Sequence, residues 1–114
     1  NLLQMHIFPC ENGDEFPKNQ YTKWFDYDKI KGTLSLRHRQ PGDYLTLPSG
    51  GRKTLKSWMI DEKIPRQERE EIWLLAEEKH ILWIVGHRIS AYYKITEQTK
   101  TILEVEFNGG KSSG

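Results

Sequence analysis

Short runs of alternating apolar and polar residues, rich in aromatic and β-branched side chains, recur along the chain and predict β-strands. We expect strands at residues 2–8, 23–30, 33–39, 44–47, 73–76, 81–85 and 101–107. Residues 81–85 are almost continuously apolar, which predicts a buried strand. Residues 101–107 alternate strictly in their last positions and predict a strand with one buried face.

The spacing changes between the fourth and fifth of these runs. Leu55, Trp58 and Met59 fall at positions i, i+3 and i+4, which predicts a helix over residues 54–60 with one core face. Pro65 suits the first position of a second short helix, residues 65–72.

Glycine, proline and asparagine mark the turns between these elements. Asn12-Gly13 and residues 48–51 predict turns, and Lys31-Gly32 predicts a hairpin between the second and third strands. Pro41 and Gly42 occupy the central positions of a four-residue turn of type II, in which glycine accepts the positive φ of the third position.

Strands, then short helices, then strands predict an α+β fold: a compact mixed β-sheet or sandwich with one or two short helices. The 114 residues fit one domain, and four tryptophans, five tyrosines and four phenylalanines supply bulk for its core. We expect a single domain at residues 1–107 and a flexible, polar tail at 108–114.

Composition narrows the cellular setting. No apolar run approaches the length of a membrane helix, and no signal peptide is visible. The lone Cys10 allows no internal disulfide, which fits a reducing compartment, so we expect a cytoplasmic protein. Because the first residue is Asn1 and a strand pattern follows at once, we interpret the chain as a piece of a larger polypeptide.

The net charge of +1 hides an uneven distribution. Residues 31–69 hold nine basic and four acidic side chains, a balance of +5, whereas the segments on either side are each at −2. A local basic block points to an anionic polymer, although solvated lysines are common on any surface.

The basic block contains two displayed arginines. In the strand at 33–39, Leu34 and Leu36 share one face with His38, so Arg37 and Arg39 lie on the opposite face together with Ser35. Asp43, just beyond the turn, is expected to pair with an arginine or to accept hydrogen bonds from nearby amides.

Further cations follow the glycine turn. Arg52 and Lys53 fall where the helix is expected to begin, the end at which the helix dipole disfavours cations. With the amides of Gly50 and Gly51 and the helix N-terminus, these two cations suggest a phosphate cradle. Lys56 follows within the same expected helix. The alternative is solvation and pairing with acidic neighbours such as Asp61 and Glu68.

Other motifs in the sequence give weaker indications of function. Ser49-Gly50-Gly51 is not followed by x-Asp-Ser, so a nucleotide-binding loop of the pyrophosphatase type is not indicated. The four histidines and Cys10 lack metal-ligand spacing, and Cys10 has no nucleophile signature. Trp58 and Trp83 belong to apolar stripes, whereas Tyr92 and Tyr93 fit either a core or a base-stacking surface.

An ordered set of motifs adds a family resemblance. It comprises an Arg-x-Arg-x-x-Gly-Asp turn, a Lys-x-Leu-Lys segment, an Ile-Pro with a following arginine, and a Trp-x-x-Gly-x-Arg segment. These are Arg37, Arg39, Gly42 and Asp43; Lys53, Leu55 and Lys56; Ile64, Pro65 and Arg69; Trp83, Gly86 and Arg88. Across residues 22–107 the chain resembles the C-terminal domain of tRNA(Ile)-lysidine synthetase.

The resemblance implies a parent enzyme that uses ATP, with magnesium, to join lysine to the wobble cytidine of tRNA(Ile). It places catalysis and ATP in an N-terminal domain, leaving this chain without catalytic residues, cofactor or metal. It implies a fold similar to a domain of the phenylalanyl-tRNA synthetase β subunit. Its expected partners are the acceptor stem of tRNA(Ile) and the catalytic domain of the same polypeptide, with no membrane and no DNA. The expected tRNA-binding residues are Arg37, Arg39, Arg52, Lys53, Lys56, Arg69 and Arg88.

Two other functions stay open at this point. The arginines of a non-catalytic docking domain would pair with acidic groups of a partner protein or of the rest of the same polypeptide. A free-standing enzyme is less well supported, because the sequence shows no nucleophile–base pair and no metal set.

Overall fold

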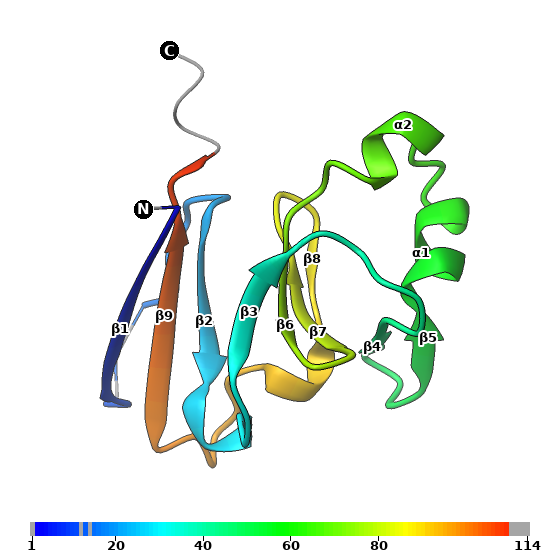
Figure 1. Ribbon diagram of the computed structural model, residues 1–114. Coiled ribbons are helices and arrows are strands. Elements are labelled where there is room, and N and C mark those ends of the chain that lie inside the picture. Colours follow the sequence, from blue (N-terminus) through cyan, green and yellow to red (C-terminus); the bar gives the residue numbers. More distant parts are fainter. Residues whose placement is uncertain (1, 12, 14, 110–114) are drawn as a thin grey trace. The chain divides into compact units, whose positions relative to one another are not determined.

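The computed structural model describes residues 2–11, 13 and 15–109 of the chain, which group into two compact units (Figure 1). Unit 1 combines the beginning and the end of the chain, Asn1–Ile30 and Tyr93–Gly114, and unit 2 is the continuous segment Lys31–Tyr92. The two units contain β-sheets with a few short helices, so the predicted α+β class is confirmed. The single-domain boundary at residue 107 stays a prediction.

Unit 1 is built on a three-stranded antiparallel sheet with the order β1-β9-β2. Its strands are β1 (Leu3–Pro9), β2 (Thr22–Asp26) and β9 (Thr101–Phe107). β9 lies in the middle and pairs with both neighbours, from Leu3 opposite Phe107 at one end to Asp26 opposite Ile102 at the other. The last strand of the chain therefore joins the first two.

A short 3-10 helix, η1 (Tyr27–Lys29), follows β2 directly. Asp26 caps this helix, because its carboxylate accepts a hydrogen bond from the amide of Asp28 at 3.2 Å. The other oxygen of the same carboxylate accepts a hydrogen bond from the Thr99 hydroxyl at 3.0 Å. The predicted strand over 23–30 is therefore wrong in its second half, where the cap turns the chain.

Unit 2 holds a larger mixed sheet with the order β3-β6-β7-β4-β5, and β8 also pairs with β7. Only β4 and β7 run parallel among these described strands. The elements in chain order are β3 (Leu34–Arg37), β4 (Tyr44–Thr46), β5 (Arg52–Thr54), α1 (Leu55–Asp61), α2 (Arg66–Arg69), β6 (Leu74–Glu77), β7 (His80–Ile84) and β8 (Arg88–Ile89). A second 3-10 helix, η2 (Ala91–Tyr93), follows β8.

The core of unit 2 forms between the sheet and α1. As predicted, Leu55, Trp58 and Met59 are the buried residues of α1, and Thr54 caps the helix by accepting a hydrogen bond from the Ser57 amide at 3.1 Å. These three pack in one cluster with Leu45, Ile64, Leu74, Ala76, Ile81 and Ile84. The cluster fixes α1 against the sheet, which matters because α1 and the β3–β4 turn together form the site.

Two predictions for the segments around β3 and β5 are wrong. The Lys31-Gly32 hairpin is wrong, because β2 pairs with β9 whereas β3 pairs with β6 in the other sheet. Arg52 and Lys53 do not begin a helix but form most of β5, which pairs with β4. The second helix is also shorter than predicted, with Pro65 as its N-cap.

Two remaining expectations involve residues that the structure does not describe. Asn12 of the predicted Asn12-Gly13 turn and residues 110–114 of the predicted tail lie outside the described residues. Within the described part of the chain, no helix is long and apolar enough to cross a membrane.

Candidate functional site

The turn after β3 is held by an ion pair that lies largely out of water. The guanidinium of Arg37 donates to both carboxylate oxygens of Asp43, at 2.8 and 3.0 Å, and the Asp43 carboxylate also accepts from the Gln40 amide at 2.8 Å. Only 1% of the Asp43 side chain and 17% of the Arg37 side chain are exposed. The predicted pairing of Asp43 with an arginine is confirmed.

Arg37 also braces the neighbouring backbone. Its guanidinium donates to the carbonyl oxygens of His38 at 2.9 Å and Glu78 at 2.7 Å. Both terminal nitrogens of Arg37 are thus used within unit 2. The geometry gives Arg37 a structural role in shaping the turn.

Gly42 completes the turn. It has a φ of +88°, and the Asp43 amide donates to the Gln40 carbonyl at 3.3 Å, so the predicted positive φ at this position is confirmed. A side chain at Gly42 would meet only Lys79 carbons at 3.8 Å, which is ordinary contact. The requirement for glycine therefore comes from the backbone rather than from crowding.

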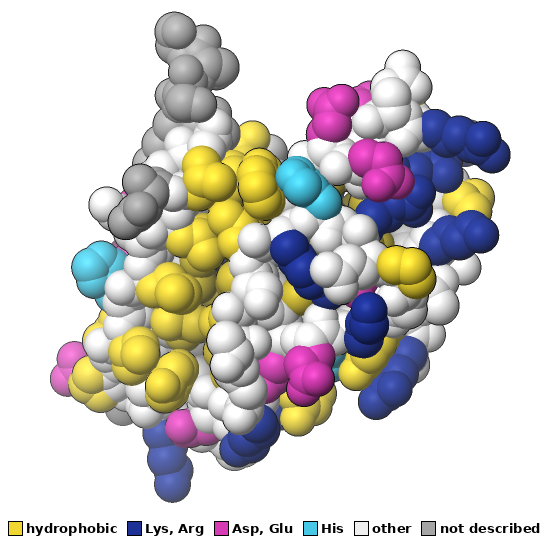
Figure 2. All heavy atoms as spheres, viewed as in Figure 1, with side chains coloured by type: hydrophobic (Ala, Val, Ile, Leu, Met, Phe, Trp, Pro, Cys, Tyr) yellow, Lys and Arg dark blue, Asp and Glu magenta, His cyan; other side chains and the backbone are white. Residues whose placement is uncertain are grey.

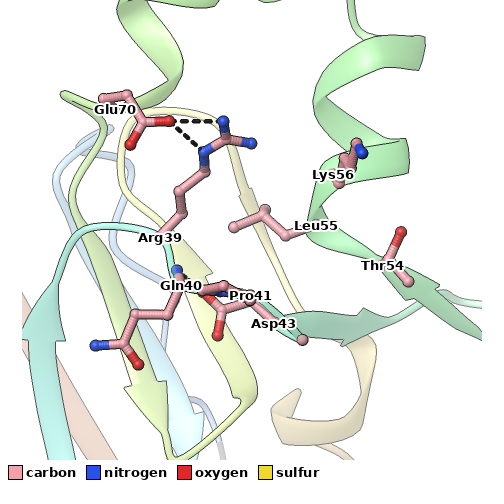
Figure 3. Close-up of a pocket in the computed structure, with 9 residues that line it drawn as sticks. Arg39, Gln40, Pro41, Asp43, Thr54, Leu55, Lys56 and Glu70 are labelled. Carbon is pink, nitrogen blue, oxygen red and sulfur yellow. Dashed lines mark hydrogen bonds and ion pairs between the residues drawn. The ribbon is translucent and has the colours of Figure 1, made fainter.

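The turn, the start of α1 and Glu70 line an open hollow of about 570 Å³. Arg39 extends from the segment after β3 to Glu70, and Lys56 stands on the first turn of α1 (Figure 3). The guanidinium uses Nε and Nη2 on one Glu70 oxygen, each at 2.6 Å. The two carboxylates of the lining are already paired, Asp43 with Arg37 and Glu70 with Arg39. Within the described part of the chain, Lys56 makes no ion pair, so it is the unbalanced charge at the hollow.

The two cations of β5 lie on opposite faces of the β4–β5 hairpin, because side chains alternate along a strand. Lys53 is opposite the buried Leu45, and its ammonium pairs with Asp61 at the end of α1. Arg52 is opposite Thr46 on the other face, where its guanidinium carbon lies 4.4 Å from the centre of the Tyr44 ring.

The phosphate cradle predicted at Gly50 and Gly51 is not formed as expected. Gly50 donates its amide to the Leu47 carbonyl at 2.8 Å, within the turn that joins β4 to β5. The helix begins later, at Leu55, and is separated from the glycines by β5.

The last two predicted site residues, Arg69 and Arg88, differ in their contacts and exposure. Arg69 donates its Nε to the Ile64 carbonyl at 2.8 Å, which ties α2 to the preceding loop. Arg88 is exposed beside a polar hollow of about 300 Å³ lined also by Trp58 and His87. Lys and Arg side chains gather on the visible face of unit 2, with acidic side chains among them (Figure 2).

The predicted seven-residue set therefore divides by surroundings. Arg39 and Lys56 share the hollow; Arg52, Lys53 and Arg88 lie at other places on unit 2; Arg37 and Arg69 brace the backbone. No group of histidine, cysteine and acidic residues suited to a metal ion occurs in the described ranges.

Sequence reasoning missed a set of stacked side chains on unit 2. The rings of Tyr44 and His80 stack with centres 4.5 Å apart, and the ring of Tyr92 lies 5.2 Å from that of His80. Burial and the nearby charge of Arg52 lower the pKa of His80 below its usual 6.5, with Glu77 opposing them. The only sequence signal was the open alternative for Tyr92.

Fold and surface together define a small α+β domain that presents cations around a shaped turn, the class of surface that meets an anionic partner. The chain belongs to the family of TilS substrate C-terminal domains, whose family model matches residues 34–106.

Named relatives agree with this assignment. The tRNA(Ile)-lysidine synthase of Caldanaerobacter subterraneus subsp. tengcongensis is 46% identical over 106 residues, which cover 92% of this chain and 23% of that protein. The tRNA(Ile)-lysidine synthase of Clostridium tetani is 41% identical over 101 residues, covering 88% of this chain and 22% of that protein. The chain thus spans about a quarter of the length of these curated relatives.

A solved structure supports the fold. The crystal structure of a TilS C-terminal domain superimposes with a TM-score of 0.65 at 26% identity, covering 93% of this chain and 85% of that one. The predicted resemblance to the TilS C-terminal domain is confirmed. The predicted likeness to a phenylalanyl-tRNA synthetase domain stays a prediction.

Proposed function

We propose that this chain is the tRNA-binding part of a tRNA(Ile)-lysidine ligase, an enzyme that uses ATP to attach lysine to the wobble cytidine of tRNA(Ile). Family membership and the names of the relatives support the proposal. Magnesium, ATP and lysine transfer belong, on this proposal, to the part of the polypeptide beyond this chain. Because an enzyme of this kind works where tRNA is, the cytoplasm is its proposed location.

The observation that carries the binding role is the hollow between the β3–β4 turn and α1. Arg39 and Lys56 line it, and Arg39 keeps guanidinium N–H donors that the Glu70 carboxylate does not use. An A-form RNA helix hides its base edges in a narrow major groove, so backbone phosphates are the accessible groups. Cations on a rigid, curved surface suit such contacts, and the acceptor stem of tRNA(Ile) is the proposed partner.

Within this surface the roles differ. Lys56, Arg39, Arg52, Lys53 and Arg88 are proposed to contact phosphates, and the last three extend the surface away from the hollow. Arg37 and Arg69 are proposed to act indirectly, because their donors hold the turn and the α2 loop in place.

A tRNA titration at two salt concentrations tests this proposal. Each phosphate contact releases counterions, so the double variant Arg39→Ala/Lys56→Ala should weaken binding and reduce the log–log salt slope by about two. Lys18→Ala/Lys100→Ala removes two exposed cations from unit 1 and serves as the charge-matched control. Equal losses in both double variants would contradict a site at the hollow.

The second candidate function is a docking domain that packs on the remaining part of its own polypeptide. It is favoured by β1, an edge strand on which Met5 and Ile7 are each at least half exposed on the same face. Met5→Lys/Ile7→Lys should then impair association with the catalytic part while leaving the tRNA affinity of this chain unchanged.

A further inference from the structure

Four flat side chains of unit 2 contact one another in series, three from the sheet and one from η2: Arg52, Tyr44, His80 and Tyr92. The guanidinium carbon of Arg52 lies 4.4 Å from the centre of the Tyr44 ring. The Tyr44 and His80 rings are 4.5 Å apart and inclined by 24°, and the His80 and Tyr92 rings are 5.2 Å apart and inclined by 39°. We call these four residues the stacked column.

The strand register places the column outside the core of unit 2. Tyr44 pairs with His80 across the parallel strands β4 and β7, and the next residue, Leu45, is buried on the opposite face. The column ends in the exposed Arg52 at one side and in Tyr92, 43% exposed, at the other. The adjacent Tyr93 is buried, so exposure is particular to Tyr92.

The middle of the column is held firmly. The Nε2 atom of His80 lies 3.0 Å from the Thr46 hydroxyl and 3.3 Å from the Ser90 hydroxyl, and Ser90 in turn accepts a hydrogen bond from the Thr46 amide at 3.0 Å. Because the pKa of His80 is lowered, its ring is mostly neutral at pH 7 and does not repel Arg52. The His80 ring that Tyr92 contacts is thus held in one orientation.

We propose that the stacked column is a platform on which one unpaired nucleobase of RNA stacks against the ring of Tyr92. This inference rests on the proposed function and deepens it, since it names the part of the RNA that this surface takes. Bases inside a duplex already stack on each other, so only an unpaired base offers its face to a tyrosine. The cation of Arg52 at the other end favours a nucleic acid over an apolar peptide.

The proposed platform and the hollow would divide the recognition of RNA between them. Cations contact the backbone without regard to sequence, whereas stacking selects an unpaired nucleotide. The chain should therefore prefer an RNA helix that continues into a single strand over a blunt helix of the same charge density.

A pair of hairpin RNAs tests the proposal. One is blunt, and the other carries a short unpaired 3′ extension with 2-aminopurine, whose fluorescence falls when it stacks. The chain should bind the extended RNA more tightly, and Tyr92→Ala should reduce that affinity roughly 5- to 150-fold. Tyr92→Trp should restore the affinity and the quenching. Tyr27→Ala, which removes a 40% exposed tyrosine of unit 1, is the matched control.

The outcomes separate this inference from the proposed function. If both RNAs bind but Tyr92→Ala leaves the preference for the extension unchanged, the platform is wrong and the tRNA-binding role stands. If neither RNA binds, both proposals fall. If Tyr92→Ala weakens only association with the catalytic part of the polypeptide, the column is a protein contact and the inference is overturned.

Discussion

The two units of this chain differ in charge and in the kind of surface they expose. Unit 2 carries eleven basic and eight acidic residues, a balance of +3, whereas unit 1 carries six and eight, a balance of −2. A net charge of +1 for the whole chain conceals this division. The difference shows that a polyanion site should be sought by unit rather than from the total charge.

The surfaces differ in the same sense. Unit 1 exposes apolar side chains such as Met5 and Ile7 on its edge strand, and unit 2 exposes cations around a turn held by Arg37 and Asp43. The first surface suits a protein partner and the second an anionic one. Experiments on the two units should therefore give separable effects.

The largest expected effect comes from the core of unit 2. Trp58 is nearly fully buried between α1 and the sheet, so Trp58→Ala should cost about 3–5 kcal/mol of unfolding free energy. Ile60 lies on the same helix but is half exposed, and Ile60→Ala should cost less than about 1 kcal/mol. Urea unfolding of both variants measures the difference, and similar costs would contradict the assignment of α1's buried face.

Next in size is the ion pair beneath the turn. Asp43→Ala leaves the partly buried Arg37 guanidinium without its carboxylate partner and the Gln40 amide without its acceptor, and should cost about 3 kcal/mol. Glu70→Ala breaks the more exposed pair with Arg39 and should cost at most about 1 kcal/mol. If thermal unfolding ranked these two variants in the reverse order, the structural role of Arg37 would be untenable.

A smaller effect is expected at the turn itself. Gly42→Ala must place a Cβ at a φ of +88° and should cost about 1 kcal/mol or more. Gly51 is not among the positive-φ glycines, so Gly51→Ala is the control and should be close to neutral. The melting temperatures of the two variants compare them, and a neutral Gly42→Ala would refute the backbone argument.

The smallest effect is a pH dependence from the stacked column. The pKa of His80 is lowered in the folded protein by burial and by Arg52, so the unfolded chain binds its proton more readily. Stability from this residue is present above 6.5 and is lost as the pH falls below that value. His80→Gln should therefore lose less stability than the parent chain between about pH 8 and about pH 5. Equal losses in the two proteins would contradict a lowered pKa of His80 in the folded chain.

Local patterns predicted the elements well where side chains alone decide them. β9 was predicted with its observed bounds, because the alternation of Leu103, Val105 and Phe107 with polar residues is a local property. The core face of α1 and the conformation of Gly42 were predicted for the same reason. In each case the structural rule acts over a few neighbouring residues.

Pairing between distant segments was not predictable in this way. β2 and the next strand along the chain, β3, belong to different sheets, and β2 instead pairs with a strand that begins at Thr101. β5 was missed because Arg52 and Lys53 carry no apolar pattern, and only its partner β4 makes it a strand. Long-range pairing depends on tertiary packing that a local pattern does not contain.

The site shows the same limit. Arg37 and Asp43 are six positions apart, and their pairing was expected, whereas the stacked column joins Tyr44, Arg52, His80 and Tyr92 from four separate segments. The sequence also assigned one role to all seven cations. The structure distinguishes those whose donors are used by the backbone from those that face the hollow.

The central position of β9 has a consequence for biosynthesis. On the ribosome, β1 and β2 are made first but have no partner in their sheet until β9 emerges, whereas all strands of unit 2 are complete once residue 92 has been translated. The edges of β1 and β2 therefore stay unpaired in their own sheet until β9 has been made. A stop codon within β9 would leave unit 2 intact in sequence, and we expect the truncated chain to aggregate through the unpaired strands β1 and β2.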